Sequence, residues 1–92
     1  MNLQEIVKNP TATIVDVRSH AEFQGGHVAG SFNVPLDQVA DRLNEFKSFS
    51  QPLVLCCASG NRSGMAASLL LSQGIECVNA GSWMDVNHLI NQ

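Results

Sequence analysis

One stretch of the sequence, residues 53–64, constrains the fold more than any other. It begins with the apolar run Leu-Val-Leu-Cys at 53–56, which predicts a strand covered on both faces of a sheet. A polar turn follows, and from Arg62 onward apolar residues recur at helical spacing until Gly74, which ends the helix. A strand, a tight turn and a helix in this order are typical of open α/β sheets, which bind ligands at the carboxyl ends of their strands.

The same stretch places a cysteine where it can react. Cys57 lies at the end of the predicted strand, directly before the turn and the helix. Backbone N–H groups and the positive end of the helix dipole meet at such a point, and both favour a thiolate over a thiol. Gly60 tolerates positive φ, so the turn can direct successive N–H groups inward. We therefore expect an anion- or thiolate-binding loop at 57–63, with Arg62 and Ser63 as additional donors.

The rest of the sequence alternates between predicted strands and predicted helices. Beside the central strand, β-branched and apolar runs predict strands at 13–17, 31–34 and 75–79. Helical spacing predicts helices at 3–9, at 36–46 and from Gly81 onward, and a short helical turn at 21–23 that Ser19 caps. Ser82 and Asp85 have the spacing of an approximate capping box. This alternation predicts parallel βαβ units with helices on both faces of the sheet.

Length, composition and charge limit the classes of function. A chain of 92 residues, 45% of them apolar, fits one core of modest size, so we expect residues 1–92 to form a single domain. The net charge is −3 with no basic stripe, which argues against nucleic-acid binding. The sequence has no apolar run of about 18 residues and no signal-peptide pattern at residues 1–8, so we expect neither a membrane span nor secretion.

The cysteines point to a reducing environment. The chain has three, and two of them are adjacent, whereas a disulfide framework uses an even and spaced set. No pair of cysteine or histidine residues has zinc-ligand spacing. We therefore expect free thiols, a cytoplasmic location, no metal site and no cofactor.

The loop that begins at Cys57 resembles the active loop of the rhodanese-like sulfurtransferases. Residues 57–63, Cys-Ala-Ser-Gly-Asn-Arg-Ser, match the family pattern Cys-x-x-Gly-x-Arg-Ser. Upstream, three segments resemble the family signature in its order and spacing: residues 15–18, 22–23 and 26–35. Gly81-Ser82-Trp83 resembles the family's Gly-Gly-Trp with serine as the second residue, and Val86 stands where a second aromatic residue is usual. Together these segments extend over residues 13–86.

The resemblance implies a fold and a reaction. The fold is a three-layer α/β structure, with a parallel sheet of four to five strands flanked by helices on both faces. The family's first strand normally precedes the opening helix, but residues 1–2 leave almost no room for it, so we expect four solid strands and a fifth that is short or missing. The implied reaction moves a sulfane sulfur through a persulfide on Cys57, with ping-pong kinetics.

The resemblance also implies the substrates and the residues that handle them. The donor is thiosulfate or a persulfide, the acceptor is cyanide or a thiol, and a protein persulfide is a further partner; we expect the chain to act as a monomer. Cys57 is the predicted catalytic residue. The predicted substrate-binding loop consists of Ala58, Ser59, Gly60, Asn61, Arg62 and Ser63. Arg62 either contacts the substrate directly or orients the loop through side-chain hydrogen bonds.

Two other functions compete with sulfur transfer. Counted from Cys56, the stretch has the pattern Cys-x5-Arg-Ser of cysteine-dependent phosphatases, whose loop is one residue longer. The position of Gly60 fits the pattern that starts at Cys57, and the predicted strand buries Cys56, so we favour Cys57 as the nucleophile. The other alternative is a non-enzymatic module that binds a partner or senses redox state. An intact loop with its cysteine argues against that interpretation.

Several polar and thiol side chains have structural interpretations. Asp16 and Arg18 follow a predicted strand and support the site, as an ion pair or through turn hydrogen bonds rather than by substrate contact. Cys56 is interpreted as a small buried residue, although a vicinal thiol could also attack the Cys57 persulfide to form a disulfide. The remaining candidates are expected to be structural: Cys77 and Trp83 in the core, His27 bonded to local backbone, and His20 and His88 on the surface.

Overall fold

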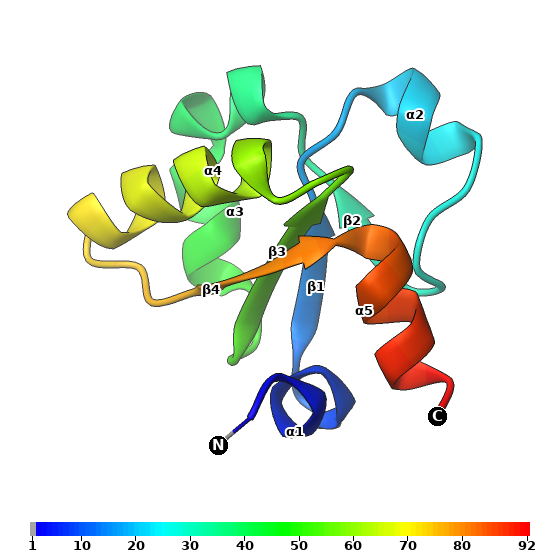
Figure 1. Ribbon diagram of the computed structural model, residues 1–92. Coiled ribbons are helices and arrows are strands. Elements are labelled where there is room, and N and C mark those ends of the chain that lie inside the picture. Colours follow the sequence, from blue (N-terminus) through cyan, green and yellow to red (C-terminus); the bar gives the residue numbers. More distant parts are fainter. Residues whose placement is uncertain (1) are drawn as a thin grey trace.

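A four-stranded parallel sheet lies at the centre of the computed structural model, which describes residues 2–92 (Figure 1). Its strands are β1 (Thr13–Asp16), β2 (Phe32–Asn33), β3 (Leu53–Cys57) and β4 (Val78–Ser82). They lie in the order β2-β1-β3-β4, and each neighbouring pair is parallel. The predicted parallel α/β sheet with four strands is therefore confirmed.

Helices cover both faces of this sheet, as the sequence predicts. They are α1 (Leu3–Lys8), α2 (His20–Gln24), α3 (Leu43–Ser48), α4 (Asn61–Ser72) and α5 (Trp83–Ile90). Helices α3 and α4 pack on one face, and α1 and α5 pack on the other. None of the helices within residues 2–92 combines the length and the apolar character needed to cross a membrane.

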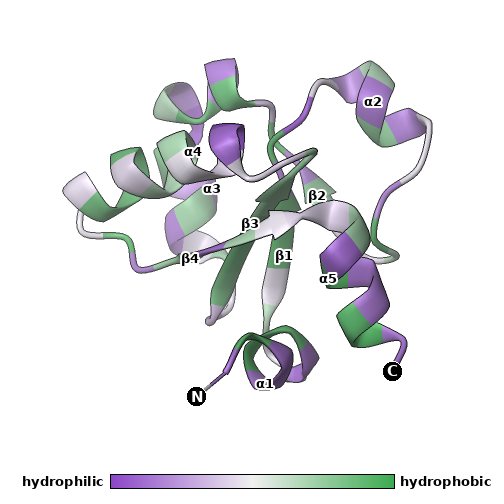
Figure 2. Cartoon of the chain, in the orientation of Figure 1, coloured by the Kyte–Doolittle hydropathy of each residue, from purple (hydrophilic) through white to green (hydrophobic). Residues whose placement is uncertain are grey.

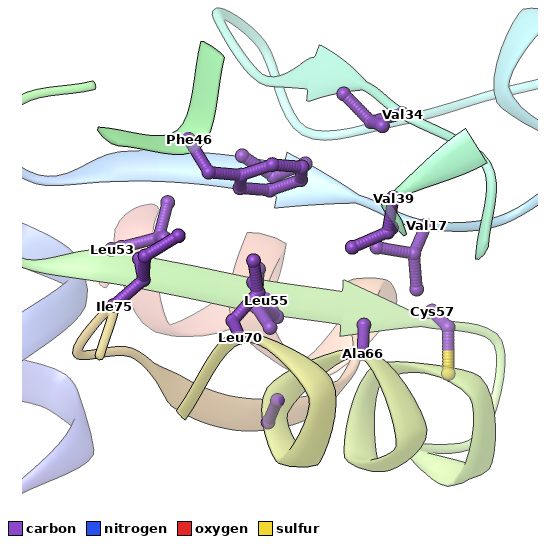
Figure 3. Close-up of a cluster of buried hydrophobic side chains, with 12 residues drawn as sticks. Val17, Val34, Val39, Phe46, Leu53, Leu55, Cys57, Ala66, Leu70 and Ile75 are labelled. Carbon is purple, nitrogen blue, oxygen red and sulfur yellow. The ribbon is translucent and has the colours of Figure 1, made fainter. Parts of the chain in front are cut away.

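Strand β3 is buried along its whole length because its side chains alternate between two cores. Leu53, Leu55 and Cys57 contribute to the core beneath α3 and α4, together with Phe46 (Figure 3). Residues 54 and 56 contribute to the core beneath α1 and α5. Figure 2 shows that β3 is hydrophobic along its length, as expected for a strand between two helical layers, whereas β1 also has less hydrophobic residues. Packing on both faces of the sheet therefore fixes the position of the end of β3.

The segment after β2 differs from its prediction. The sequence predicts one helix over 36–46, but the chain forms two 3₁₀ turns, Leu36–Gln38 and Ala40–Arg42, before α3 begins. The apolar residues recur at intervals of three and four, which suit a 3₁₀ turn as well as an α-helix. Val39 and Phe46 are nevertheless completely buried. The predicted buried face is confirmed, and the continuous helix is wrong.

The last strand also lies further along the chain than predicted. The sequence predicts a strand at 75–79, whereas β4 extends over Val78–Ser82. The turn that ends α4 occupies the first of these residues: Gly74 adopts φ 75°, and the Ile75 N–H donates to the Leu70 carbonyl at 2.9 Å. Cys77 therefore precedes the strand; it packs against the core beneath α3 and α4 but is only half-buried, so its predicted place in the core is correct only in part.

Helix α5 consequently begins at Trp83 rather than at Gly81. Ser82 caps it by accepting a hydrogen bond from the Met84 N–H at 3.2 Å, instead of forming the predicted box with Asp85. The Trp83 ring is half-buried and lies against the guanidinium of Arg18, 4.8 Å from the ring centroid. The prediction that Trp83 packs within the core is therefore correct only for part of its surface.

Candidate active site

The loop at 57–61 joins the carboxyl end of β3 to the first turn of α4. Gly60 lies at its tightest point, with φ 103°, a conformation that residues with a side chain rarely adopt. A Cβ atom at this position would also lie 3.3 Å from the Cα of Gly81 in β4. Glycine is thus required both by the backbone conformation and by the close approach of β4. The predicted tight loop is confirmed.

Three donors, one from this loop and two from the first turn of α4, converge on the Cys57 sulfur. The Gly60 N–H lies 3.0 Å from Sγ, the Ser63 N–H lies 3.4 Å away, and the Ser63 hydroxyl oxygen lies 3.3 Å away. Burial by itself would raise the pKa of Cys57. The Ser63 hydroxyl and the N–H groups of Ser63, Gly60 and Ser59 outweigh that effect and lower the pKa below its ordinary value. The site therefore stabilises a thiolate.

Asn79 fixes the geometry of these donors from the neighbouring strand. Its Oδ1 accepts hydrogen bonds from the Ser63 hydroxyl at 2.7 Å and from the Gly81 N–H at 3.0 Å, and its Nδ2 donates to the Gly60 carbonyl at 3.1 Å. The Ser63 hydroxyl has one proton and two acceptors, Asn79 Oδ1 and the Cys57 sulfur. When that proton turns to the sulfur, the Gly81 N–H still satisfies Oδ1.

Sequence reasoning missed this role of Asn79. The available signal was a polar side chain at the end of a predicted strand, because the carboxyl ends of parallel strands share one edge of the sheet. In the structure Asn79 is the second residue of β4 and lies opposite Leu55, and its side chain reaches Gly60 and Ser63 from there. A polar residue there is a candidate neighbour of the reactive loop.

A Ser63→Ala variant should make the Cys57 thiol less acidic. Removing the hydroxyl takes away a donor that favours the charged form, so the midpoint of the pH–rate profile for alkylation should move to higher pH. Near neutral pH, alkylation by iodoacetamide should slow about fivefold, the effect of one ordinary hydrogen bond. The rate is measured by mass spectrometry on the peptide that contains Cys57.

Ser72→Ala is the matched control for this experiment. The Ser72 hydroxyl lies at the other end of α4 and donates only to the Leu69 carbonyl, at 2.6 Å. Its profile should coincide with that of the wild type. A Ser63→Ala profile that also coincides with the wild type would contradict the role given to the hydroxyl.

Arg62 is oriented by a carboxylate from another helix. Its Nη1 and Nη2 donate to the Glu22 Oε1 and Oε2 at 2.6 and 2.9 Å. Side-chain exposure is 36% for Arg62 and 38% for Glu22, so the pair lies at the surface. The Arg62 guanidinium, with the Ser19 N–H, lowers the pKa of Glu22 to about 2. Of the two predicted roles of Arg62, the pair supports an orienting one, and contact with substrate stays a prediction.

Asp16 and Arg18 form the predicted ion pair at the end of β1. The Arg18 Nη2 lies 2.7 Å from the Asp16 Oδ2, with both side chains almost fully buried. The Arg18 Nε also donates to the same carboxylate, and Nη2 donates to the Gly26 carbonyl at 2.7 Å. This pair connects β1 to the loop after α2. It supports the edge of the sheet that carries Cys57.

Cys56 points away from the reactive loop. Adjacent residues of a strand face opposite sides of the sheet, and Cys56 packs in the core beneath α1 and α5, with no exposed surface. Burial, with the nearby Asp16 carboxylate, raises the pKa of Cys56 to about 12. The prediction of a small buried residue is confirmed. The opposite orientation of the two thiols argues against a disulfide between Cys56 and Cys57.

The predicted histidine environments are also found. The His27 Nδ1 lies 2.7 Å from the Phe23 carbonyl oxygen, so this side chain bonds local backbone. His20 and His88 are exposed. Among residues 2–92, no group of three or more His, Cys, Asp or Glu side chains is arranged to hold a metal ion.

Nearly all of the described chain matches one family model. The model for the rhodanese-like domain aligns with residues 2–88, which include both the Cys57 loop and the Asp16–Arg18 pair. The chain belongs to the rhodanese-like domain family.

The chain is also similar to individual proteins and solved structures. The chain is 43% identical to the uncharacterized protein YqhL of Bacillus subtilis, over 68% of this chain and 49% of that protein. It is 35% identical to the thiosulfate sulfurtransferase GlpE of Pseudoalteromonas translucida, over 80% of this chain and 70% of that one. The solved rhodanese with anions from E. coli superposes with a TM-score of 0.72 at 30% identity, over 80% of this chain and 89% of that one.

These relatives differ in length from the chain. It spans 49% and 40% of the first two curated relatives, YqhL and the putative sulfur carrier protein YrkF, both from Bacillus subtilis. The family assignment applies to this chain, whereas its activity, substrates and partners are matters for proposal.

Next to Arg62, at the start of α4, this rhodanese-like domain has an open cleft of about 590 Å³. The residues that line it follow β1, follow β2 or begin α4: Val17, Ser19, His20, Pro35, Leu36, Asp37, Gln38 and Arg62. Val17, Pro35 and Leu36 are apolar, and the others are polar or charged. A molecule bound in the cleft would contact α4 through Arg62.

Proposed function

We propose that this chain is a sulfurtransferase that carries sulfane sulfur as a persulfide on Cys57. The observation that carries the proposal is the set of N–H and hydroxyl donors of Gly60 and Ser63 around the Cys57 sulfur. These donors favour the thiolate, which is the nucleophilic form of cysteine. The family assignment and the name of the GlpE relative support the same chemistry.

The first half of the reaction loads the enzyme. The Cys57 thiolate attacks the outer sulfur of thiosulfate, the bond between the two thiosulfate sulfurs breaks, and sulfite leaves with the bonding electron pair. Cys57 is then a persulfide anion. Loop N–H groups at 58–63, next to the start of α4, favour negative charge on the added sulfur.

The second half of the reaction removes the added sulfur from Cys57. A nucleophile such as cyanide attacks the outer sulfur of the persulfide, the S–S bond breaks, and the Cys57 thiolate is restored with thiocyanate as product. A thiol acceptor would take the sulfur as a new persulfide in the same way. The cleft beside Arg62 has room for the body of such an acceptor, including one carried by a protein. Because donor and acceptor react in separate steps, ping-pong kinetics are expected.

Incubation with thiosulfate should add one sulfur atom to Cys57. Intact-protein mass spectrometry detects the addition, and fragmentation of the peptide that contains residues 56–57 assigns it to one of the two thiols. Cyanide should then remove the added mass and release thiocyanate. A protein that gains no sulfur from thiosulfate or from a low-molecular-weight persulfide would contradict the proposal and favour a partner-binding role.

Burial of Cys56 disfavours the phosphatase alternative. That reaction would need a Cys56 thiolate that faces the loop, but Cys56 packs in the core beneath α1 and α5, and burial raises its pKa to about 12. The donors at Gly60 and Ser63 instead surround the Cys57 sulfur. Sulfur transfer through Cys57 is therefore the function that the geometry supports best.

A further inference from the structure

The Glu22–Arg62 pair lies at the start of α4, next to the loop that follows Cys57, and contributes no net charge there. Contacts other than those to Arg62 also orient Glu22. Its Oε1 accepts hydrogen bonds from the Ser19 N–H and the Ser19 hydroxyl, both at 3.0 Å. This capping box at the start of α2 aims the carboxylate at α4. Both carboxylate oxygens then bond the two terminal nitrogens of Arg62, at 2.6 and 2.9 Å. The guanidinium is therefore fixed and matched by one negative charge.

The guanidinium of Arg18, at the end of β1, is also paired with a carboxylate. Arg18 is paired with Asp16 inside the protein, with a side-chain exposure of 6%. Of the remaining cations, Lys8 and Lys47 lie in α1 and α3, and Arg42 is paired with Glu45 while it also donates to Gln38 in the lining of the cleft. The loop therefore attracts anions through its N–H groups and the start of α4 rather than through an excess of positive side chains.

We propose that Glu22 is a specificity-determining residue that reduces the preference of this site for doubly charged sulfur donors by neutralising Arg62. The proposal rests on the sulfur-transfer function proposed above. Arg62 has five N–H donors, of which Glu22 occupies two, and its side chain is one-third exposed in the wall of the cleft. Without the Glu22 charge, the same guanidinium would add a full positive charge to the anion site. Glu22 thus tunes which donor loads Cys57.

Two donors of different charge separate this effect from the chemistry. Thiosulfate carries two negative charges and loses sulfite, whereas methanethiosulfonate carries one and loses methanesulfinate. In both cases the Cys57 thiolate takes the outer sulfur, the S–S bond of the donor breaks, and the leaving group keeps the electron pair. The enzyme product is the same persulfide. Only the charge of the donor differs between the two loading reactions.

A Glu22→Gln variant tests the proposal. The amide keeps the size of the side chain and an oxygen that can accept from Ser19, but it removes the negative charge. With cyanide as acceptor, the KM for thiosulfate should fall about fivefold and the KM for methanethiosulfonate about twofold, because the Coulomb energy scales with donor charge. Both decreases should shrink at 0.5 M salt, where exposed charges are screened.

Two further variants control for indirect effects. Glu76→Gln removes an exposed carboxylate that lies before β4, and should leave both KM values unchanged. Combining Glu22→Gln with Arg62→Gln should cancel the gain for thiosulfate, since the gain needs the freed guanidinium. Equal changes for the two donors, or a higher KM for thiosulfate in Glu22→Gln, would overturn the proposal.

A second measurement separates this proposal from the function on which it rests. Iodoacetamide is uncharged, so its reaction with Cys57 can be measured while an unreactive anion occupies the loop. Sulfate should protect Cys57 in Glu22→Gln at about one-fifth of the concentration needed in the wild type, and methanesulfonate at about one-half. If the protective concentrations fall in this way but no sulfur is transferred, the sulfur-transfer function is refuted and the effect of Glu22 on anion binding is supported. If sulfur is transferred but protection and KM values are unchanged, the function is supported and the role of Glu22 is refuted.

Discussion

A Cys57→Ser variant should transfer sulfur from thiosulfate to cyanide at about one-thousandth of the wild-type rate or less, because it lacks the nucleophile itself. A serine hydroxyl stays protonated near neutral pH, and its oxygen cannot hold a sulfane sulfur as a persulfide. The donors on the cysteine sulfur, the N–H groups of Gly60 and Ser63, would remain in place but would have no thiolate to stabilise. The measurement is the steady-state rate of thiocyanate formation.

Cys56→Ala is the matched control, since it removes the neighbouring thiol from the same strand. Cys56 faces the opposite core and has no exposed surface, so its loss should leave the rate within about twofold of the wild type while lowering stability slightly. Hydrolysis of an aryl phosphate that is lost in Cys56→Ala and kept in Cys57→Ser would instead assign the reaction to Cys56 and contradict the sulfur-transfer mechanism.

The reactive loop could be predicted because its determinants are local. An apolar strand, a glycine at the tight point and a helix start lie within residues 53–64, and the structure forms each of them. The orientation of the two thiols also follows locally, since neighbours on a strand face opposite sides. Burial of Cys56 and placement of Cys57 against the loop donors needed no knowledge of distant residues.

The side-chain contacts around the loop could not be predicted because the two partners of each contact lie far apart in the sequence. Glu22 and Arg62 are 40 positions apart, and Ser63 and Asn79 are 16 apart. The capping pattern of Ser19 and Glu22 predicts the start of α2, but it does not indicate that the same carboxylate reaches α4. Such contacts depend on how the helices pack. Sequence spacing alone does not encode them.

The errors in the predicted elements have a related cause. The apolar residues of 36–46 were expected to form one helix, and their spacing fits a 3₁₀ turn equally well. The start of β4 depends on the length of the turn that follows α4. Because the Ile75 N–H bonds back to α4, this turn is longer than predicted and β4 begins later. In 36–46 the buried side was predicted correctly and the backbone conformation was not. In 75–79 the start of the strand was predicted wrongly, and Cys77 is only half-buried.

An Asp16→Asn variant should lose about 3–5 kcal/mol of the free energy of unfolding, because it leaves the buried Arg18 without a counter-charge. Asp16 has no exposed surface and Arg18 is 5% exposed, so water cannot replace the lost carboxylate. The asparagine amide would also place N–H groups against the Arg18 Nη2, which lies 2.7 Å from Oδ2 in the native pair. Urea denaturation, followed by far-ultraviolet circular dichroism, measures the change through the midpoint at constant m value.

The comparison with the surface pair Arg42–Glu45 shows why burial decides the size of this effect. The closest N–O distance is 2.7 Å in both pairs, yet the side chains of Arg42 and Glu45 are 33% and 50% exposed. Water solvates either partner when the other is removed, so Glu45→Gln should leave the midpoint unchanged. Equal midpoints for Asp16→Asn and Glu45→Gln would contradict the role of the buried pair. If the expected order holds, the buried pair of Asp16 and Arg18 stabilises the edge of the sheet that carries Cys57.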